Sequence, residues 1–443
     1  MNKYSSYKSS GVEWIGEIPE TWDSGKMKYV LSNNDGGVWG SDIENEEGGN
    51  IVIRSTEITI DGNWDFSNPL KRDLTKNEII KSKLYEGDIV ITKSSGSPQH
   101  IGKSVIVSKE IELLNCCYSN FVQRIRFRNY NPKLYHFILN SDIGRSQFKY
   151  LTTTSTGLGN LNGSSLNDIL LPFIPLIEQE RIVKYLIEKT TIIDKLISTK
   201  QRKVELLKEQ RTTLINQVIT KGLNPKVKMK NSGLEWIGEI PESWSFVKLG
   251  HYTIIVRGSS PRPSGDPLYF DGDFINWITV GELTNSVGKY ITHTESMLTE
   301  KGMKQSRIIE VNTLLLSNSG ATLGVPKITK IKGCINDGSV GFIKIYSELS
   351  QDYLYHFLTT QTKLLREQQS GYGQPNLNIE IVSNIKLPLP SKSEQEQIVE
   401  FLDKHTKEID DLVSMEQKKE ELLKEYRQSL ISEVITGKIM VVE

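Results

Sequence analysis

The stretch from Glu178 to Thr220 reads EQERIVKYLIEKTTIIDKLISTKQRKVELLKEQRTTLINQVIT, and it contains neither glycine nor proline. Its apolar residues recur at alternating steps of three and four, which is the a/d spacing of a coiled coil. At about 1.5 Å per residue this stretch predicts a helix roughly 60 Å long. A helix so long and amphipathic needs a partner. Its predicted seam comprises Val183, Leu186, Ile193, Ile197, Val204, Leu207, Leu214 and Val218.

A second stretch, from Glu394 to Thr436, repeats this pattern, with EQEQIVEFL matching EQERIVKYL and ELLKEYR matching ELLKEQR. Lys200 in the first seam corresponds to Glu416 in the second, and both lie near their helix midpoints. Antiparallel pairing would bring these opposite charges close together, so we predict an antiparallel coiled coil. The alternative is that each helix packs separately on its own domain. The second seam comprises Val399, Leu402, Ile409, Val413, Leu423, Leu430 and Val434.

The rest of the chain is also one plan used twice, as a self-comparison shows. Residues 10–22 read SGVEWIGEIPETW and residues 232–244 read SGLEWIGEIPESW, while LYHF occurs at 134–137 and again at 354–357. Short β-like runs dominate each globular half, for example Asn50 to Ile53, and helical patterns follow at 132–150 and 351–369. We therefore predict a mixed α/β fold with two duplicated α/β domains and two long helices. The predicted boundaries are 1–172 for the first domain, 173–224 for the central helix, 225–389 for the second domain and 390–443 for the C-terminal helix.

Composition excludes several classes of protein. The 443 residues are 37% hydrophobic, which is ample for two or more domains with real cores. The formal net charge is zero, which excludes a generally basic nucleic-acid coat but not a locally basic surface. Cys116, Cys117 and Cys334 have no metal or disulfide spacing. There is no signal-peptide pattern and no apolar run long enough to span a membrane, so we expect a cytoplasmic protein without membrane partners.

Two motifs suggest enzymatic chemistry but fall short of it. Residues 96–104, GSPQHIGKS, have five residues between their glycines where a Walker A motif has four, and a strand pattern follows. Residues 266–269, DPLY, nearly match the DPPY box of amino-methyltransferases, but no glycine-rich cofactor loop follows a strand elsewhere. The six histidines have no metal-ligand spacing. The sequence therefore predicts no catalytic site, no metal and no cofactor.

Four motifs together resemble the specificity subunit of type I restriction–modification enzymes. They are the SG[VL]EWIGEIPExW opening, RGSSPRP at 257–263, GYGQPNLN at 371–378, and the EQExIV start of a long helix that ends in VITG. They cover nearly the whole chain in the family's order. The first half departs from the pattern, because residues 156–162 read TGLGNLN without Gln-Pro. Where the second half has RGSSPRP, the first half has NNDGGVWG.

The resemblance implies two target-recognition domains, each reading one half of a split, asymmetric sequence in double-stranded DNA. It implies that the paired helices set the gap between the half-sites and dock two methyltransferase subunits. Restriction and motor subunits would join to make the full complex. The chain would then be a non-catalytic subunit that directs adenine methylation. Two rival functions are a duplicated coiled-coil adaptor without DNA specificity, and an enzyme acting alone, such as a methyltransferase.

Several polar residues are candidates for DNA contact. In RIRFR the three arginines alternate, so on a strand they would share one face, as a phosphate or guanine reader or as a solvated sheet face. Residues that the halves share cannot distinguish two different targets, so Asn160, Asn162, Asn376 and Asn378 are expected to be scaffold or shared-backbone contacts. Base readers should lie where the halves differ. The full candidate set is Lys93, Ser95, Gln99, His100, Lys103, Arg124, Arg126, Arg128, Arg257, Ser259, Arg262, Gln369, Tyr372 and Gln374.

Overall fold

The computed structural model describes residues 3–43, 48–155, 158–234, 237–286, 288–319, 322–368 and 377–442. Contacts divide the chain into two compact units. Unit 1 comprises Met1–Gln201 together with Lys418–Glu443, and unit 2 comprises Arg202–Gln417. Each unit therefore holds one α/β half of the sequence and part of each long helix.

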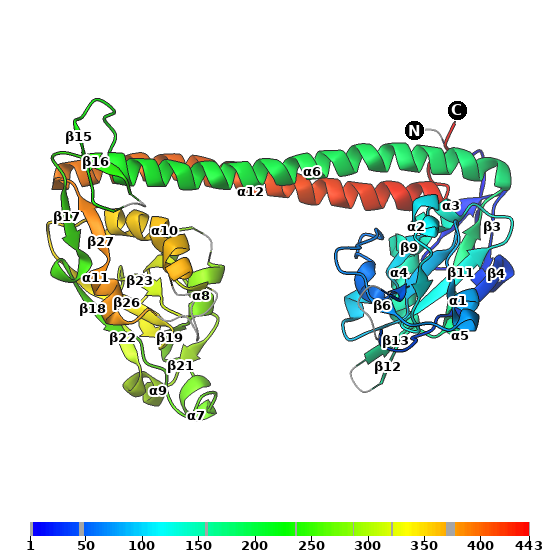
Figure 1. The fold of residues 1–443 in the computed structure, drawn as a ribbon, viewed down its shortest axis with the longest axis horizontal. Helices are drawn as coiled ribbons and strands as arrows, with labels where there is room; N and C mark the ends of the chain where they lie inside the picture. Colours follow the sequence, from blue (N-terminus) through cyan, green and yellow to red (C-terminus); the bar gives the residue numbers. More distant parts are fainter. Residues whose placement is uncertain are drawn as a thin grey trace. The chain divides into compact units, whose positions relative to one another are not determined.

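Unit 1 is built on a four-stranded antiparallel sheet whose order is β4-β11-β7-β9 (Figure 1). The apolar run of β7 is buried along its whole length, as expected for a central strand. A second sheet has the order β10-β5-β6, and a small one has the order β12-β13-β8. The strands are β4 (Leu31–Gly36), β5 (Asn50–Ile53), β6 (Lys71–Arg72), β7 (Ile89–Thr92), β8 (Ser94–Ser95), β9 (Ser104–Ile106), β10 (Cys117–Tyr118), β11 (Val122–Phe127), β12 (Thr153–Ser155) and β13 (Leu158–Asn160).

Short helices and two pairs of antiparallel strands complete unit 1. The paired strands are β1 (Tyr7–Ser9) with β2 (Glu17–Pro19), and β3 (Asp23–Lys26) with β14 (Leu170–Phe173). The helices are α1 (Lys76–Ser82), α2 (Lys109–Leu113), α3 (Pro132–Asn140), α4 (Asp142–Leu151) and α5 (Gly163–Asn167), with 3-10 turns η1 (Met27–Tyr29), η2 (Ser55–Glu57) and η3 (Pro98–His100).

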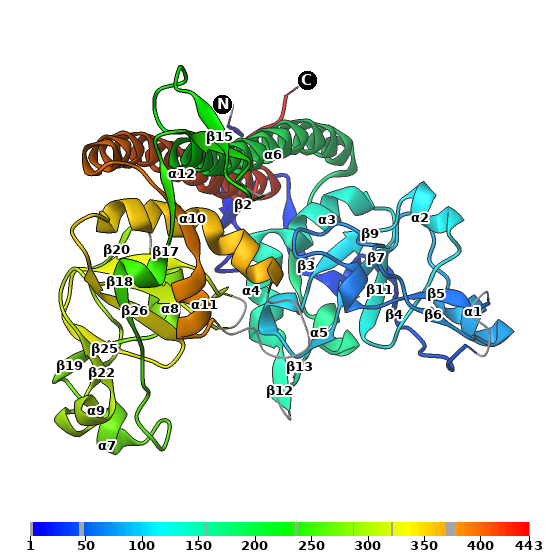
Figure 2. The ribbon, with the colours of Figure 1, turned by 60° about the vertical axis from the view of Figure 1, so that its left-hand side comes forward.

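Unit 2 repeats this plan with a five-stranded sheet of order β18-β26-β23-β24-β20 and a four-stranded sheet of order β21-β19-β25-β22 (Figure 2). The strands are β18 (Thr253–Arg257), β19 (Ile275–Ile278), β20 (Tyr290–Ile291), β21 (Met297–Leu298), β22 (Arg307–Ile309), β23 (Leu314–Ser317), β24 (Pro326–Thr329), β25 (Gly333–Ile335) and β26 (Ser339–Ile345). Two further pairs are β15 (Met229–Asn231) with β16 (Glu239–Pro241), and β17 (Ser245–Lys248) with β27 (Lys386–Leu389). The helical elements are α7 (Pro267–Phe270), α8 (Val280–Asn285), α9 (Glu300–Gln305), α10 (Gln351–Gln368), α11 (Ile379–Asn384) and the 3-10 turn η4 (Leu249–His251).

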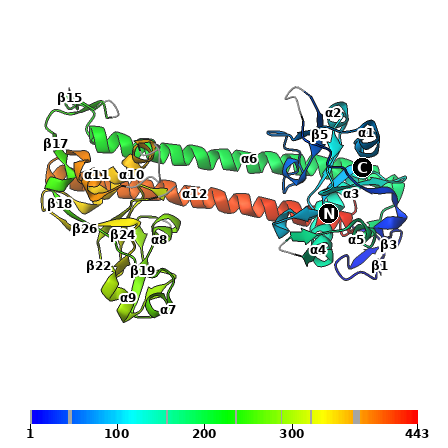
Figure 3. The same ribbon diagram turned by 60° about the horizontal axis from the view of Figure 1, so that its bottom comes forward.

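The two long helices, α6 (Leu176–Lys221) and α12 (Lys392–Ile435), pair antiparallel in both units (Figures 1 and 3). In unit 1, Arg427 pairs with Asp194 at 2.8 Å and Gln201 donates to Glu420 at 2.8 Å. In unit 2, Lys203 pairs with Glu416 at 3.0 Å and Arg211 with Asp410 at 2.8 Å. Residue numbers rise along one helix as they fall along the other. The predicted antiparallel pairing is confirmed. Glu416 pairs with Lys203, which lies three residues from the predicted partner Lys200.

Most of the predicted seam is buried. Leu186 and Leu402 are fully buried, each within the core of its own unit. The buried members of the predicted seam are Val183, Leu186, Ile193, Ile197, Val204, Leu207, Val218, Leu402, Ile409, Leu430 and Val434. The half-buried members are Leu214, Val399, Val413 and Leu423. No helix within the described ranges is both long and apolar enough to cross a membrane.

The repeated sequence motifs attach each half to a long helix. The Trp22 indole donates to the Glu178 carboxylate on α6 at 3.3 Å, and the Trp244 indole donates to Glu394 on α12 at 2.9 Å. In the NLN motifs, Asn162 and Asn378 are N-cap residues, which accept from the amides of Ser165 and Ile381. The repetition therefore marks scaffold at these positions, as predicted for Asn162 and Asn378. Asn376 lies outside the described residues.

Candidate nucleic-acid interface

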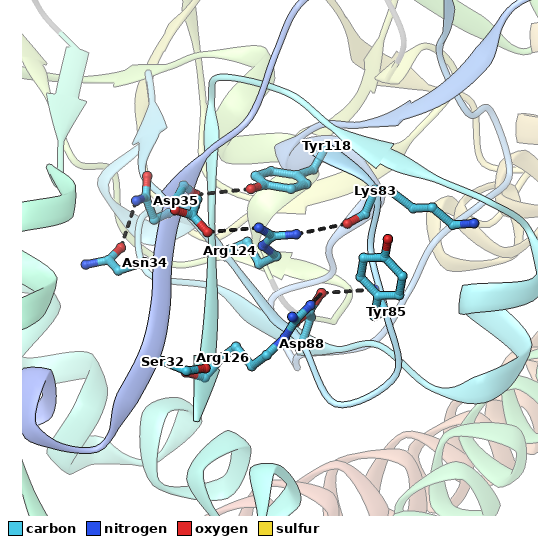
Figure 4. A network of polar contacts seen from close by, with 10 residues as sticks. Ser32, Asn34, Asp35, Lys83, Tyr85, Asp88, Tyr118, Arg124 and Arg126 are labelled. Atoms are coloured by element: carbon cyan, nitrogen blue, oxygen red, sulfur yellow. Dashed lines mark hydrogen bonds and ion pairs between the residues drawn. The ribbon is translucent and has the colours of Figure 1, made fainter. Parts of the chain in front are cut away.

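The arginines of β11 are held by acidic side chains from other strands and loops (Figure 4). The Arg124 guanidinium pairs with Asp35 on β4 at 2.8 Å and donates to the carbonyl of Lys83 at 2.9 Å. The Arg126 guanidinium makes two bonds to Asp88, of 2.6 and 2.9 Å. Asp88 is fully buried and Arg124 is nearly so. Both positive charges are therefore compensated inside unit 1.

This pairing corrects the prediction of an open face with three arginines. The bonds to Asp88 raise the pKa of Arg126 and stabilise its charged form where it lies. A register shift between Arg126 and Phe127 also interrupts the alternation. Arg128 lies beyond β11 and is exposed. Of the three arginines, Arg128 alone stays in our candidate set for DNA contact.

Lys103 is also removed from the set of candidates. Its side chain is buried, and its ammonium donates to the carbonyl of Ser55 at 2.8 Å and to that of Ile58. Burial lowers the pKa of Lys103. In unit 2, Lys327 does the same with the carbonyls of Ser286, at 2.6 Å, and Gly288, and burial lowers its pKa to about 8. In unit 1 Lys103 thus binds carbonyls of the η2 turn, and in unit 2 Lys327 binds carbonyls that follow α8.

Other candidates of the first half lie around the turn between β7 and β9. Gln99 and His100 on η3 are exposed, and Ser95 on β8 is half-buried. Lys93 is half-buried, with its Nζ 3.4 Å from Gln123 Oε1, and burial lowers its pKa. The Arg145 guanidinium of α4 donates to the Gln99 carbonyl at 2.8 Å and so holds this turn.

A basic cavity beside this turn was missed by sequence reasoning. It has a volume of about 350 Å³, and Arg145 and Lys149 of α4 are its two charged lining residues. Burial lowers the pKa of Arg145. The signal available in the sequence was the pair of basic residues one turn apart on a predicted helix. The cavity lining is Gln99, Ile101, Arg145, Ser146, Lys149 and Thr152.

In the second half, the candidate residues at the end of β18 and just after it are exposed. Arg257 and Arg262 are exposed, and both bond to Asp337: Arg257 to its carbonyl and Arg262 to its carboxylate, each at 3.2 Å. The Ser259 hydroxyl is exposed and donates to the Gln305 carbonyl at 3.1 Å. The remaining candidates, Gln369, Tyr372 and Gln374, lie outside the described residues.

The repeated histidines pack inside their units. His136 contacts the Ser104 carbonyl at 3.3 Å, and His356 contacts the Asp403 carboxylate of α12 at 2.7 Å. Asp403 also binds Lys289 at 2.9 Å. Among the residues that the structure describes, no group of three or more His, Cys, Asp or Glu side chains could hold a metal ion.

Comparison with known proteins gives a consistent result. The family profile described as "Type I restriction modification DNA specificity domain" matches residues 19–208 and 241–424. The chain is 26% identical to the MjaX specificity subunit, a type I restriction enzyme subunit of Methanocaldococcus jannaschii, with 96% of each chain covered. It is also 26% identical to the MjaVIII specificity subunit of that organism, over 96% of this chain and 94% of the relative.

A solved structure shares the fold. It comes from work on complex assembly and conformational transition of the type I restriction–modification system. The likeness covers 95% of this chain and 99% of the other, with a TM-score of 0.72 and 17% identity. At that identity the match speaks for the fold alone.

Proposed function

The chain belongs to the type I restriction–modification DNA specificity family, and from this premise we propose that it selects the DNA sequence on which its complex acts. The observation that carries the proposal is that the family profile matches once in each α/β half. The proposed target-recognition domains are residues 1–172 and 225–389. The chain is a specificity subunit and not the catalytic member of the complex. The adaptor function without DNA specificity is not favoured by these matches.

Each half reads one part of a bipartite site in double-stranded DNA. Positions with an internal structural task, such as the N-caps Asn162 and Asn378, are shared by the halves. The exposed polar residues differ between the halves, which is what two different half-sites require. The candidates for DNA contact that we retain from the sequence are Lys93, Ser95, Gln99, His100, Arg128, Arg257, Ser259, Arg262, Gln369, Tyr372 and Gln374. To these we add Arg145 and Lys149, which line the basic cavity of unit 1.

The long helices dock the partner subunits. Large apolar side chains remain exposed along them in both units, and such surfaces commonly mark protein interaction sites. They are Ile187, Ile192, Leu196, Leu422 and Tyr426 in unit 1, and Leu206, Leu412 and Met415 in unit 2. We assign this surface to methyltransferase subunits, one on each unit. Restriction subunits join the complex for cleavage.

A domain exchange tests the proposal. Residues 20–170 are replaced by the corresponding domain of another family member, and methylated adenines are mapped by long-read sequencing in cells that express the chain with its partner subunits. One half-site should change completely while the other is retained. A simultaneous change of both half-sites would refute the assignment of one reader to each half. Methyl transfer by the highly purified chain without partners would refute its non-catalytic role.

A further inference from the structure

The loops that follow β4 and β18 occupy equivalent corners of the two halves. A Cβ on Gly37 would lie 2.0 Å from the Tyr118 carbonyl oxygen, and one on Gly258 would lie 1.9 Å from that of Asn336, so both loops pass equally close to a neighbouring strand. One residue later, the Val38 amide donates to Tyr118 and the Ser259 amide donates to Ile335. Trp39 therefore corresponds to Ser260.

Strand registers give a second correspondence at the same corner. Val122 pairs with Thr92 in the first half, and Ser339 pairs with Ser317 in the second. The amides of Val122 and Ser339 each bond three residues back, to Ser119 and Asn336. The residues just before these strands, Phe121 and Gly338, are therefore equivalent.

In the first half this corner is apolar and open. The rings of Trp39 and Phe121 meet edge to face, with centroids 5.3 Å apart. Trp39 is 37% exposed and Phe121 is 43% exposed. The buried Arg72 lies against the indole, with its Cζ 4.9 Å from the ring, and its Nε donates to the Trp39 carbonyl at 3.2 Å. The indole thus lies between Arg72 and Phe121, and both aromatic rings keep apolar surface that faces solvent.

The corner also lies beside the loop that carries the polar candidates. The amides of Lys93 and Ser94 donate to the Phe121 carbonyl, at 3.1 and 3.3 Å. Ser94 begins β8, which continues into the turn with Gln99 and His100. The main chain of Phe121 therefore lies against the start of the segment that carries those residues.

In the second half the same corner is polar. Ser260, in place of Trp39, donates to the Asp337 carboxylate at 2.7 Å, and Arg262 binds the same carboxylate at 3.2 Å. Gly338, in place of Phe121, has no side chain. One scaffold position thus carries two exposed aromatic rings in one half and a serine–aspartate–arginine group in the other.

We propose that Trp39 and Phe121 contact the 5-methyl group of a thymine in the first half-site and so make an A·T pair part of that target. Thymine is the base whose major-groove edge carries an apolar group. The equivalent corner of the second half reads its bases by hydrogen bonds through Arg262. This inference rests on the proposed DNA recognition and names the chemistry of one reader.

Deoxyuridine substitution tests it, because uracil pairs like thymine and lacks only the methyl group. The probe is a duplex that carries the modified sequence mapped in cells, with each thymine replaced in turn by deoxyuridine. Binding by the chain in complex with its partner subunits is measured for every probe. Burial of one methyl group predicts a loss of affinity of roughly fourfold at one thymine.

Variants then assign that thymine to the corner. The Trp39→Ser and Phe121→Ser complexes should bind the thymine and deoxyuridine probes with equal affinity at this position. The Trp39→Phe complex should keep part of the affinity difference between the two probes. Tyr29→Ser is the control, because it removes another exposed aromatic ring of unit 1. This variant should keep the whole affinity difference between the two probes. If no thymine is sensitive, or if the sensitive one stays so in Trp39→Ser, the inference is wrong. If the complex shows no sequence-specific binding at all, the proposed function itself fails.

Discussion

The central strands β11 and β26 occupy the same place in the two halves, but only β11 carries charged side chains at two of the aligned positions. Their registers align Arg124 with Gly341 and Ile125 with Phe342, so Arg126 aligns with Ile343. In the first half the two arginines bind Asp35 and Asp88 (Figure 4). In the second half the same positions are glycine and an exposed isoleucine. An internal ion-pair network is thus one way to build this sheet and not a requirement of the fold.

The attachment of each half to its long helix shows the opposite behaviour. Trp22 with Glu178 and Trp244 with Glu394 make the same contact. Within the helices themselves, the hydroxyls of Thr190 and Thr406 donate to the carbonyls of Leu186 and Leu402, four residues back, each at 2.7 Å. The halves therefore agree where they meet the helices and diverge in their sheets and loops. That is the division expected of one scaffold that serves two targets.

The largest expected effect tests the shared part. Leu186→Ala and Leu402→Ala each remove a fully buried side chain at equivalent positions, and each should lower the free energy of unfolding by about 2–5 kcal/mol. Urea titration of the full chain measures this loss. Leu207 is buried as well, so Leu207→Ala should lower the free energy of unfolding by a similar amount. Leu423 is half-buried, so Leu423→Ala should lower it by less. Leu196 is exposed, so Leu196→Ala is the control and should change the free energy of unfolding by no more than about 0.5 kcal/mol. Strongly unequal losses for Leu186 and Leu402 would break the equivalence of the two units.

The next effect tests the divergent strand. Arg126→Met leaves the buried carboxylate of Asp88 without its cation, which should lower the free energy of unfolding by about 3 kcal/mol. The exposed Arg128→Met should leave stability within about 0.5 kcal/mol and should weaken DNA binding instead. Urea titration and salt-dependent DNA retention separate the two outcomes. Arg126→Met that retains full stability but binds DNA weakly would restore Arg126 as a reader.

A smaller effect concerns acid sensitivity. Burial lowers the pKa of His136 to about 4, so the folded chain keeps the ring neutral while the unfolded chain takes up a proton near pH 6.5. The stability contributed by neutral His136 is complete above about pH 6.5 and is lost as the pH falls towards about 4. Between about pH 6.5 and about pH 5 the loss should be about 1.5 kcal/mol, and His136→Gln should abolish it.

His356 should contribute a weaker dependence of stability on pH than His136 does. Burial lowers the pKa of His356 as well, but the bond to Asp403 opposes that shift. His356→Gln should therefore change the acid dependence less than His136→Gln does. Thermal unfolding measured across this pH range checks both variants, and a larger change from His356→Gln would contradict the assignment.

The smallest effect concerns the NLN motifs. Asn162→Ala and Asn378→Ala each remove one N-cap, which should cost about 1 kcal/mol of stability in either half. Neither substitution should change the modified sequence, because the side chains serve the scaffold. Calorimetry and methylation mapping of the two variants check these statements. A shifted target sequence would show that the shared asparagines read DNA.

One repeated motif does not align the residues that make equivalent contacts in the two halves. The LYHF repeat aligns Tyr135 with Tyr355 by sequence. In the structure it is Tyr353 whose hydroxyl donates to Pro388, at 2.9 Å, as that of Tyr135 donates to Pro172, at 3.3 Å. The helices present their tyrosines to equivalent carbonyls from positions that differ by two residues. A residue's role follows the contact it can reach and not its place in a short motif.

The sequence by itself determined the architecture. The spacing of apolar residues in 178–220 and 394–436 predicted the long helices, and the opposite charges of Lys200 and Glu416 near their midpoints predicted the antiparallel pairing. The β-like run at 50–53 predicted β5 with its observed bounds. Periodicity is a local property: a stripe of buried side chains repeats with the pitch of its own helix or strand. Duplication added the two-part plan, because the same local patterns recur once in each half.

Only the tertiary structure decided which polar residues are free to bind. The partners of Arg124 and Arg126 lie 89 and 38 residues away in the chain, and the carbonyls that hold Lys103 lie 48 and 45 residues away. Nothing in the spacing of RIRFR or GKS indicates those partners. The partners of the two arginines are fixed by the pairing of β11 with β4 and β7, and that register depends on how the whole core packs. The spacing of charged residues can be seen in a short stretch of sequence. The groups that neutralise or bind those charges are distant in sequence and come close only in the folded chain.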